Sequence, residues 1–239
     1  MISIITVSLN VGSRIKNTAD SIVNQTSDNF EWIVIDGGST DCTLDILRHY
    51  KTKMTYFVSE KDKGIYNAMN KGIARSKREY CIFVNGGDEF FDNKAVERFC
   101  AFHEKADYNY GSIMEVNGSR KIVKYSERIV DLKKHLFKRS LPHQSSYIRR
   151  RLFEKCGGYD EGLSILSDQD FCKKAILKHG ASVQHLPWIN SIFYFDGLSY
   201  KTKNSVQALK EKSIIQKRYF GLLYRVIQAK NEAFSRFRI

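Results

Sequence analysis

The sequence predicts an α/β fold built on a mostly parallel central sheet. Over residues 1–91, apolar strand-like runs alternate four times with segments of helical periodicity. Each apolar run ends abruptly in glycines, amides or acids, which is where the strands of an open α/β sheet meet a ligand. The later part of the chain switches to short strands and helices, so we expect a smaller mixed region there.

Four apolar runs predict the parallel strands. They cover residues 3–9, 30–35, 54–58 and 80–84. Helical spacing predicts helices over residues 14–25 and 65–76, and a third helix capped by Ser39 or Thr40 with Leu44, Leu47 and Tyr50 inward. Alternation of this kind implies parallel strands joined by right-handed crossovers.

The second half mixes element types. We expect helices over residues 94–103, 151–156 and 167–179, the second ended by Gly157 and the third by Gly180. We expect a hairpin turning at Asn117-Gly118-Ser119. Further strands are expected over residues 142–148, 181–186 and 192–195.

Composition places the chain among ordinary globular proteins. Its 239 residues are 42% hydrophobic and 27% charged. No apolar run approaches the ~20 residues that cross a bilayer. The five cysteines are odd in number and form no C-x-x-C pair, which fits reduced thiols. We therefore expect a cytoplasmic protein.

The net charge of +13 is concentrated at the C-terminus. Residues 201–239 hold ten Lys or Arg against only Glu211 and Glu232. We expect residues 205–239 to form a basic amphipathic helix. Such a helix binds an anionic membrane surface, or packs on the rest of the chain or a second subunit, and the sequence leaves these alternatives open.

Three polar loops follow predicted strands, at Asp36, Asp62 and Asp88. Because parallel strands end at one edge, we expect these acids and their neighbouring glycines to converge. Carboxylates beside glycine turns suit a hard divalent cation with phosphate oxygens. The chain lacks GxGxxG after its first strand and lacks GxxxxGK[ST], which argues against dinucleotide and P-loop sites. The sequence therefore predicts a nucleoside diphosphate held by acids and a metal.

These motifs, in this order, resemble family 2 glycosyltransferases of the GT-A fold, of the bacterial type that builds O-antigen, capsule or exopolysaccharide repeat units. The motifs are Thr6-Val-Ser-Leu-Asn10, Val34-Ile-Asp-Gly-Gly-Ser-Thr-Asp41, the run over residues 59–72, Asn85-Gly-Gly-Asp88, Pro142-His-Gln144, the run over residues 157–161 and Ser167-Asp-Gln-Asp170. The resemblance implies a catalytic domain over residues 1–204. Its nucleotide-sugar half would be residues 1–91 and its acceptor half residues 92–204, followed by the tail.

The resemblance implies a uridine nucleotide site on the first half. Asp36 would hydrogen-bond the uracil ring, and Asp62 would lie near the base or sugar. Lys63 would neutralise the diphosphate or be solvated. The remaining contacts are expected from Thr6, Ser8, Asn10, Asn85, Gly86 and Gly87.

The stretch Asn85-Gly-Gly-Asp88 stands where the family carries its acid-x-acid metal motif. Here the first acid is replaced by an amide, which leaves Asp88 as the one strong ligand of the loop. Mn²⁺ or Mg²⁺ often relies on substrate phosphates for its other ligands, so the resemblance still implies one of these ions as cofactor.

The second half would supply the catalytic base. Asp168 resembles the carboxylate that takes the acceptor hydroxyl proton in an inverting displacement. Four further residues are expected near the acceptor or diphosphate, with Asp170 favoured as structural and His143 equally compatible with plain burial: His143, Gln144, Asp170 and Ser199.

The leading hypothesis is an inverting, metal-dependent transferase that moves a hexose or N-acetylhexosamine from a UDP-sugar to a saccharide. The acceptor would be linked to undecaprenyl diphosphate, and the enzyme would lie on the inner face of the cytoplasmic membrane, with a homodimer as a further expectation. One alternative is a nucleotidyltransferase that makes sugar nucleotides, for which Asn10 to Arg14 offers a weak loop. Another is a basic nucleic-acid-binding protein, but no such motif is found.

Overall fold

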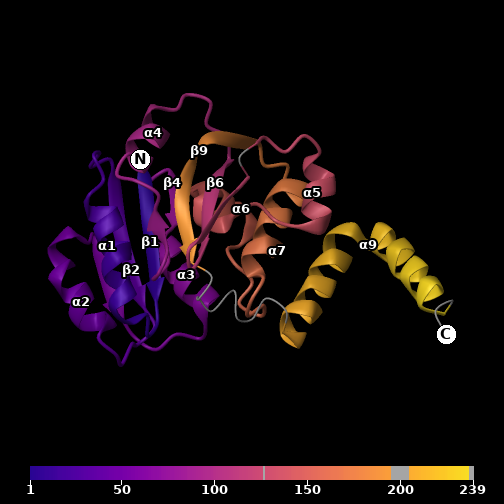
Figure 1. Ribbon diagram of the computed structural model, residues 1–239, viewed down its shortest axis with the longest axis horizontal. Helices are drawn as coiled ribbons and strands as arrows, with labels where there is room; N and C mark the ends of the chain where they lie inside the picture. The colour runs from indigo at the N-terminus through magenta and orange to yellow at the C-terminus, as the bar shows by residue number, and fades with distance from the viewer. Residues whose placement is uncertain (126, 195–204, 237–239) are drawn as a thin grey trace.

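A computed structural model of the protein describes residues 1–125, 127–194 and 205–236, with the side chains of the last range described only as far as Gly221 (Figure 1). The strands of these residues form one sheet in the order β3-β2-β1-β4-β8-β6-β9-β5, with β7 paired to β6. Helices cover both faces of the sheet (Figure 1). The predicted α/β class is confirmed.

The first half is the parallel unit expected from the alternating pattern. Its strands are β1 (Ile2–Ser8), β2 (Phe30–Asp36), β3 (Tyr56–Ser59) and β4 (Tyr80–Phe83). Its helices are α1 (Ile15–Val23), α2 (Thr43–His49) and α3 (Ile65–Arg75), with 3₁₀ turns η1 (Gly12–Arg14) and η2 (Lys51–Lys53). All pairings among these four strands are parallel.

The central strand β1 is buried on both faces, which explains its nearly unbroken apolar sequence. Ile5 and Val7 face a core shared with α3 and the second half of the chain. Ile2 and Ile4 face the opposite core, which includes α1 and α2. Side chains alternate across the sheet in this way because successive residues of a strand point to opposite faces.

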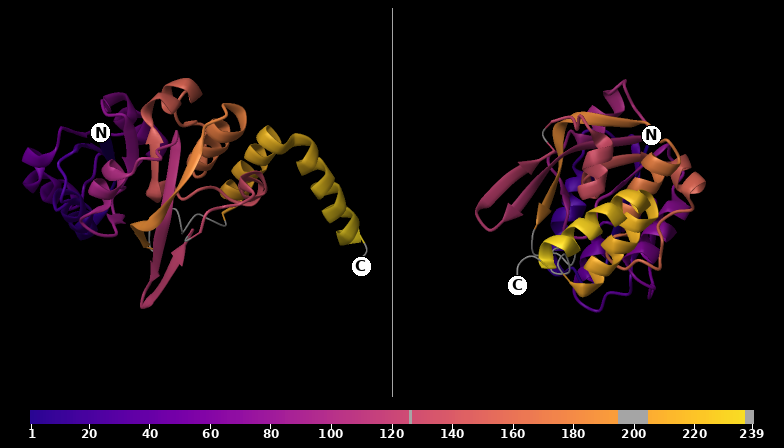
Figure 2. Two further views of the ribbon diagram at one scale, coloured as in Figure 1. Left: turned by 90° about the horizontal axis from the view of Figure 1, so that it is seen from above. Right: turned by 90° about the vertical axis from the view of Figure 1, so that its right-hand side faces the viewer.

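The second half extends the sheet with mixed pairings. Its elements are α4 (Ala95–Ala101), β6 (Tyr108–Asn117), β7 (Arg120–Lys124), β8 (Ser146–Arg149), α6 (Arg150–Cys156), α7 (Ser167–Lys173) and β9 (Val183–Tyr194). The predicted hairpin turns at Gly118, and its two strands project from the body (Figure 2). Gly157 closes α6 with φ +79°, as its position predicted.

Three predicted strands were wrong in their bounds. The strands expected over residues 181–186 and 192–195 are not separate, because residues 183–186 and 192–194 belong to one strand, β9, that continues through Pro187; residue 195 lies outside the described residues. Shifts in its register with β6, beside Gly111, absorb the irregular middle of the strand. The stretch 142–148 is not a strand throughout, because residues His143–Ser145 form a 3₁₀ turn, η3, ahead of β8.

Other errors concern caps and short elements. Ser39 and Thr40 do not cap α2, which begins at Thr43 after Asp41 accepts the Thr43 N–H at 3.0 Å. The predicted helix over 167–179 becomes a π-helical turn, η4 (Lys174–Lys178), in its second half. Two elements were not predicted: β5 (Glu89–Phe90) and α5 (Leu132–Lys138).

The basic tail is helical, as expected. Helix α9 (Val206–Arg236) bends at Phe220, whose φ is −129°. Ahead of the bend, Ala208, Ile215 and Phe220 are buried against the body, with Phe220 edge-on to Phe137 of α5. Beyond it the helix extends away from the body (Figure 2). None of the helices described is long and apolar enough to cross a membrane.

Candidate active site

The turns after β2, β3 and β4 meet on one rim of the sheet. Asp36 at the end of β2 pairs in register with Ser8 of β1 on one side and Ser59 of β3 on the other. The turn after β4 is attached to β1, because the Gly86 N–H donates to the Val7 carbonyl at 2.9 Å. The rim therefore brings the three predicted loops to the carboxyl ends of the parallel strands.

Asp36 is fully buried and its carboxylate is already occupied. One oxygen accepts from the hydroxyls of Ser8 (2.9 Å) and Ser39 (2.6 Å). The other accepts from the Ser59 hydroxyl (2.8 Å) and the N–H groups of Gly38 (3.0 Å) and Ser39 (2.8 Å). Five donors fill the acceptor capacity of a carboxylate. Asp36 thus shapes the 37–39 turn. Direct contact between Asp36 and uracil stays a prediction, and the five hydrogen bonds that Asp36 already accepts argue against it.

Asp62 lies over the same turn and is more accessible than Asp36. A Cβ on Gly37 would lie only 2.4 Å from its Oδ2, so glycine at position 37 leaves the room that this carboxylate occupies. Its Oδ1 accepts the Gly64 N–H at 2.8 Å, which fixes the side chain at the start of α3. The structure therefore places the partly accessible Asp62 carboxylate over the turn that Asp36 shapes.

The other predicted nucleotide contacts on this side differ in character. Thr6 is buried and its hydroxyl accepts the Trp32 indole N–H at 3.0 Å, so its side chain belongs to the core. Asn10 ties β1 to the next turn, since its N–H donates to Ser39 and its Oδ1 accepts the Thr40 N–H, both at 2.8 Å. Lys63 is exposed on the rim.

The Asn85–Asp88 turn is tightly built around its glycines. The Asp88 N–H donates to the Asn85 carbonyl at 2.8 Å, and Gly87 has φ +99°. A Cβ on Gly87 would lie 2.4 Å from the guanidinium of Arg14, which donates to the Gly87 carbonyl at 3.2 Å. The glycine therefore allows a cation from η1 to lie directly against this turn.

Asp88 has the electrostatics of a carboxyl group that lacks full compensation. It is only 8% exposed, and burial raises its pKa to about 8, with the Arg14 charge acting in the opposite direction. In the same turn, the buried Asn85 Oδ1 has no hydrogen-bond partner among the described residues. A buried acceptor of this kind is costly unless a ligand satisfies it.

Asp168 lies at the start of α7, in contact with the nucleotide half. Its Oδ1 is 2.9 Å from the hydroxyl of Tyr66, a buried residue on α3. Burial, and next the charge of Asp168, raise the pKa of Tyr66 well above its ordinary value. Tyr66 is therefore a neutral donor, and it joins the predicted base to the helix that follows the Asp62 loop.

His143 lies near Asp168 and packs among aromatic rings. Its ring stacks on Phe83 with centroids 5.0 Å apart and meets Tyr159 edge-on. Burial lowers the pKa of His143, while the nearby Asp168 charge acts to raise it. Within the described residues, neither His143 Nε2 nor the Tyr159 hydroxyl has a partner. Two buried polar atoms next to the predicted base are thus available to a bound molecule.

The remaining predicted residues do not join this cluster equally. Asp170 is buried and pairs with Arg218 of α9 at 2.8 Å, which fits the structural role that the sequence favoured. Gln144 follows His143 in η3, and its carbonyl accepts the Ser191 hydroxyl. Ser199 lies outside the described residues.

Comparison with known families identifies the chain. The sequence model of glycosyl transferase family 2 matches residues 3–171, which is more than half of the chain. The chain belongs to this family. A PGL/p-HBAD biosynthesis glycosyltransferase of Mycobacterium bovis is 34% identical over 177 residues, covering 72% of this chain and 68% of the relative. An uncharacterised glycosyltransferase of Mycobacterium tuberculosis is 32% identical over 185 residues, covering 74% and 69%.

Solved structures confirm the GT-A fold of this family 2 glycosyltransferase. S. aureus TarS 1-349 in complex with UDP-GlcNAc matches with a TM-score of 0.74 and 20% identity, covering 92% of this chain and 67% of that one. Mannosyltransferase PcManGT from Pyrobaculum calidifontis, in complex with GDP-Man and Mn²⁺, matches with a TM-score of 0.60 and 16% identity, covering 96% and 64%. The chain spans 66% of another TarS 1-349 structure.

The family's metal fits the donor set of the Asn85–Asp88 turn. The described residues contain no group of three or more His, Cys, Asp or Glu that could hold an ion by themselves. The turn does offer one buried carboxyl group, Asp88, and the orphaned amide oxygen of Asn85. Oxygen ligands of this number suit Mg²⁺ or Mn²⁺ when substrate phosphates complete the shell.

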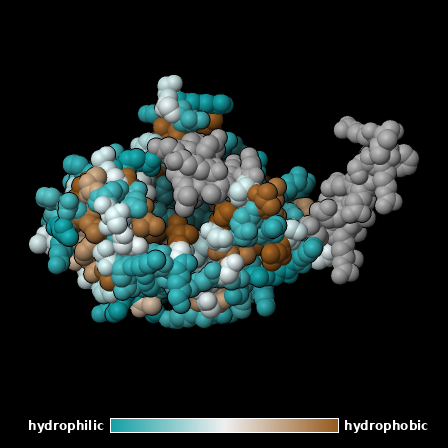
Figure 3. All heavy atoms as spheres, turned by 90° about the horizontal axis from the view of Figure 1, so that it is seen from below, coloured by the Kyte–Doolittle hydropathy of each residue, from teal (hydrophilic) through white to brown (hydrophobic). Residues whose placement is uncertain are grey.

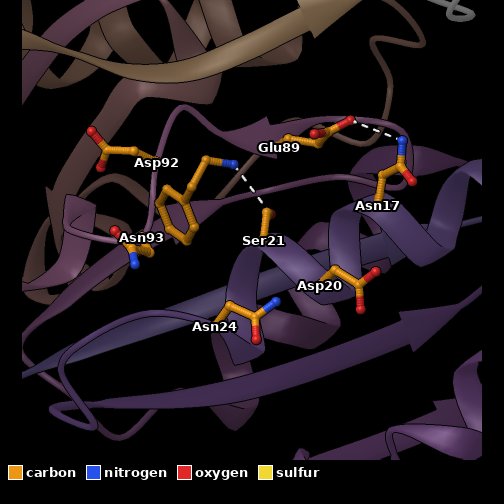
Figure 4. A pocket seen from close by; sticks show the side chains of 8 residues that line it. Asn17, Asp20, Ser21, Asn24, Glu89, Asp92 and Asn93 are labelled. Carbon is orange, nitrogen blue, oxygen red and sulfur yellow. Dashed lines mark hydrogen bonds between the residues drawn. The ribbon is translucent and has the colours of Figure 1, made fainter.

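A polar depression lies beside the Asn85–Asp88 turn, between α1 and β5 (Figure 4). It has a volume of about 290 Å³ and is lined by Asn17, Asp20, Ser21, Asn24, Glu89, Phe90, Asp92 and Asn93. Its acids are already engaged: Asp20 pairs with Lys16 and Asp92 with Arg98, while Asn17 donates to Glu89 at 3.4 Å. We therefore assign it no part in the site.

Two residues of the site were not predicted. Arg14 was considered only as part of a weak nucleotidyltransferase-like loop, because its contact with the Gly87 carbonyl spans 73 positions of sequence. Tyr66 lies inside the 59–72 motif but carried no predicted role, because its contact with Asp168 spans 102 positions of sequence. Neither contact follows from local spacing.

Proposed function

We propose that the protein transfers a hexose or N-acetylhexosamine from a UDP-sugar to a saccharide acceptor, with inversion and with help from a divalent cation. The observation that carries the proposal is the contact between Tyr66 and Asp168. It joins a carboxylate of the second half to the rim that would hold the nucleotide. Membership of a glycosyltransferase family decides against the nucleotidyltransferase and nucleic-acid-binding alternatives.

For the uracil base of the nucleotide, we propose that Asp62 makes the direct contact and that Asp36 shapes the turn beneath Asp62. Uracil presents an N3–H between two carbonyls, and the Asp62 carboxylate is the accessible acceptor on this part of the rim. Guanine presents a comparable N–H, so a carboxylate does not discriminate alone. The support for uridine is that TarS, with a TM-score of 0.74, is the neighbour solved with UDP-GlcNAc.

For the diphosphate, we propose the Asn85–Asp88 turn together with Arg14. Asp88 and the Asn85 amide oxygen would hold Mn²⁺ or Mg²⁺, which supplies Lewis-acid stabilisation of the leaving diphosphate when bound. Arg14 adds a fixed positive charge next to the same turn. Lys63 lies exposed on the same rim and would contribute only to long-range attraction.

For the chemical step, Asp168 acts as general base. Inverting transfer is a direct displacement at the anomeric carbon, so a carboxylate must accept the acceptor hydroxyl proton on the face opposite the diphosphate. Tyr66 fixes one oxygen of Asp168 and leaves the other for that hydroxyl. We propose that His143 Nε2 and the Tyr159 hydroxyl, which have no partner among the described residues, hydrogen-bond sugar hydroxyls of the substrate.

For the acceptor, we propose a saccharide carried on a lipid diphosphate, reached at the inner face of the cytoplasmic membrane. The first part of α9 exposes Val206, Leu209 and Ile214, and its outer surface also carries exposed lysines 210 and 217. Apolar (brown) and hydrophilic (teal) side chains are mixed on the surface next to the grey end of this helix (Figure 3). Apolar and basic groups together suit an anionic bilayer surface.

The transfer is tested with a panel of UDP- and GDP-sugars and a synthetic GlcNAc- or GalNAc-diphosphate-lipid, scored by the mass of the product. We expect a mass gain of one sugar from a UDP donor in Mn²⁺ and none in EDTA. Transfer from GDP donors alone, or the same yield in EDTA, would overturn the uridine or the metal part.

The membrane contact is tested by flotation with anionic vesicles. We expect the wild-type protein to float and the double variant Leu209→Glu, Ile214→Glu to remain in the dense fraction. Equal flotation of the two proteins would contradict the contact.

A further inference from the structure

Tyr66 serves two acceptors with a single hydroxyl proton. Its oxygen lies 2.7 Å from the Ile165 carbonyl and 2.9 Å from Asp168 Oδ1. Both distances are hydrogen-bond distances, yet one O–H can be directed fully to only one of them. The ionised carboxylate is the stronger acceptor, so the Tyr66 hydroxyl donates to Asp168 and has the Ile165 carbonyl as a second possible acceptor.

Ile165 is held from its other side by the C-terminal helix. Its N–H donates to Glu211 Oε2 of α9 at 3.0 Å, so Glu211 and Tyr66 hold the same residue. The same carboxylate also accepts the N–H groups of Ser164 (2.8 Å) and Leu166 (2.9 Å). Three consecutive backbone amides that lead into α7 therefore converge on one side chain.

Glu211 is built for this contact rather than for solvent. It is only 1% exposed, although it lies on a helix rich in lysine. Burial acts to raise its pKa, but hydrogen bonds from Gln207 and the backbone amides outweigh burial and lower it. The residue is thus an ionised acceptor at neutral pH, and its charge is used by the loop.

A second contact from α9 holds the other side of Asp168. Arg218 donates to the buried carboxylate of Asp170 at 2.8 Å and reaches Asp160 at 3.3 Å. Glu211 therefore holds residues 164–166 ahead of Asp168, and Arg218 holds Asp170, two positions after it. Helix α9, which was predicted as a tail, therefore packs against the segment that carries the predicted base, Asp168.

We infer that Tyr66 and Glu211 are positioning residues of the general base, and that α9 is part of the catalytic unit. This inference rests on the proposed function, because it takes Asp168 as the base. Tyr66 holds Asp168 Oδ1 while the carboxylate is ionised, so Oδ2 faces the acceptor. When Oδ2 takes the acceptor proton, the negative charge is lost and the Tyr66 proton turns to the Ile165 carbonyl. Glu211 keeps that carbonyl in place, and Tyr66 retains its own proton throughout.

The test compares Tyr66→Phe, Glu211→Gln and their combination with two matched controls. Tyr50→Phe removes another tyrosine hydroxyl that donates to an aspartate, Asp20, at 2.7 Å, outside the site. Glu31→Gln alters another buried glutamate that accepts backbone N–H groups of a loop, at Lys77 (2.6 Å) and Arg78 (3.2 Å). Melting temperature, UDP affinity by calorimetry, and kcat against pH are measured for each.

We expect Tyr66→Phe and Glu211→Gln each to lower kcat by about tenfold or more, with UDP affinity within about twofold of wild type. The acidic limb of the kcat profile should move to higher pH in Tyr66→Phe, since the ionised base loses a donor. The combined loss should be smaller than the product of the single losses, because both residues hold Ile165. Both Glu31→Gln and Glu211→Gln should melt at a lower temperature than wild type, but Glu31→Gln should keep the wild-type kcat.

Two results would overturn the inference. One is a kcat of Glu211→Gln equal to that of Glu31→Gln. The other is a pH profile of kcat in Tyr66→Phe that matches wild type. Because Tyr66 lies on α3, this second variant still tests the inference if Glu211→Gln fails to fold. Asp168→Asn separates the two levels: wild-type turnover in that variant removes the proposed base itself. If Asp168→Asn is inactive while the positioning variants turn over normally, only the inference fails.

Discussion

The contrast between Asp36 and Asp62 gives a quantitative prediction. Asp36→Ala would leave five donors without their acceptor: the hydroxyls of Ser8, Ser39 and Ser59 and two backbone N–H groups. Each unsatisfied buried donor costs about 1–3 kcal/mol, and hydroxyl rotation and water recover part of that sum. We therefore expect a loss of about 4 kcal/mol, comparable with breaking other buried polar networks. In a chain of this size that lowers the melting temperature by about 10 °C.

Asp62→Asn should behave in the opposite way. The side chain is of equal size and partly accessible, so the free energy of unfolding should change by about 0.5 kcal/mol or less. UDP affinity should fall by about tenfold, because the amide presents a donor or a weaker acceptor to the base N–H. The assays are thermal unfolding and UDP calorimetry on both variants. A stable Asp36→Ala protein that has lost UDP binding would refute the reasoning, as would an Asp62→Asn protein that melts early and binds UDP normally.

Three further predictions concern the chemistry and the core. The pKa of Asp88 in the folded state, about 8, exceeds its ordinary value of 3.8, so the stability of the wild-type protein falls as pH rises between those values. Asp88→Asn removes this carboxyl group. Without metal, the variant should therefore have a higher melting temperature than wild type at about pH 8, yet show no Mn²⁺-dependent transfer. Asp168→Asn should bind UDP normally and lose about 10³-fold in kcat, and a loss below tenfold would count against a base at this position. Gly72→Ala would place a Cβ 2.5 Å from Ile5, so it should lower stability by about 1–3 kcal/mol, and an unchanged melting temperature would contradict the packing.

The parallel half of the fold was predictable because its signals are local. The apolar runs of β1, β2 and β4 and the glycines after them place strands and turns within a residue or two of the structure. The strand β9 was split because Pro187 interrupts its apolar pattern, and a register shift against β6 is a property of the pairing rather than of either sequence. Helix α5 was missed because only Leu136 is fully buried in it.

The site shows the same limit. Residues on one loop, such as Asn85 and Asp88, could be grouped from their spacing alone. The occupancy of Asp36 depends on Ser8 and Ser59, which come from two other strands, so the sequence indicated an available acid where the structure shows a filled one. The link from Glu211 to Asp168 passes through backbone amides, which carry no side-chain signature. Such contacts exist only once the tertiary structure has formed.

The account is tested most directly by a crystal structure of the protein with UDP and Mn²⁺. We expect the uracil N3 at hydrogen-bond distance (about 2.7–3.2 Å) from the Asp62 carboxylate. We expect the ion on Asp88 and the diphosphate, and Asp36 still bonded to its serines. A nucleotide bound away from this rim, or a uracil held by Asp36 with its serine contacts broken, would contradict the account.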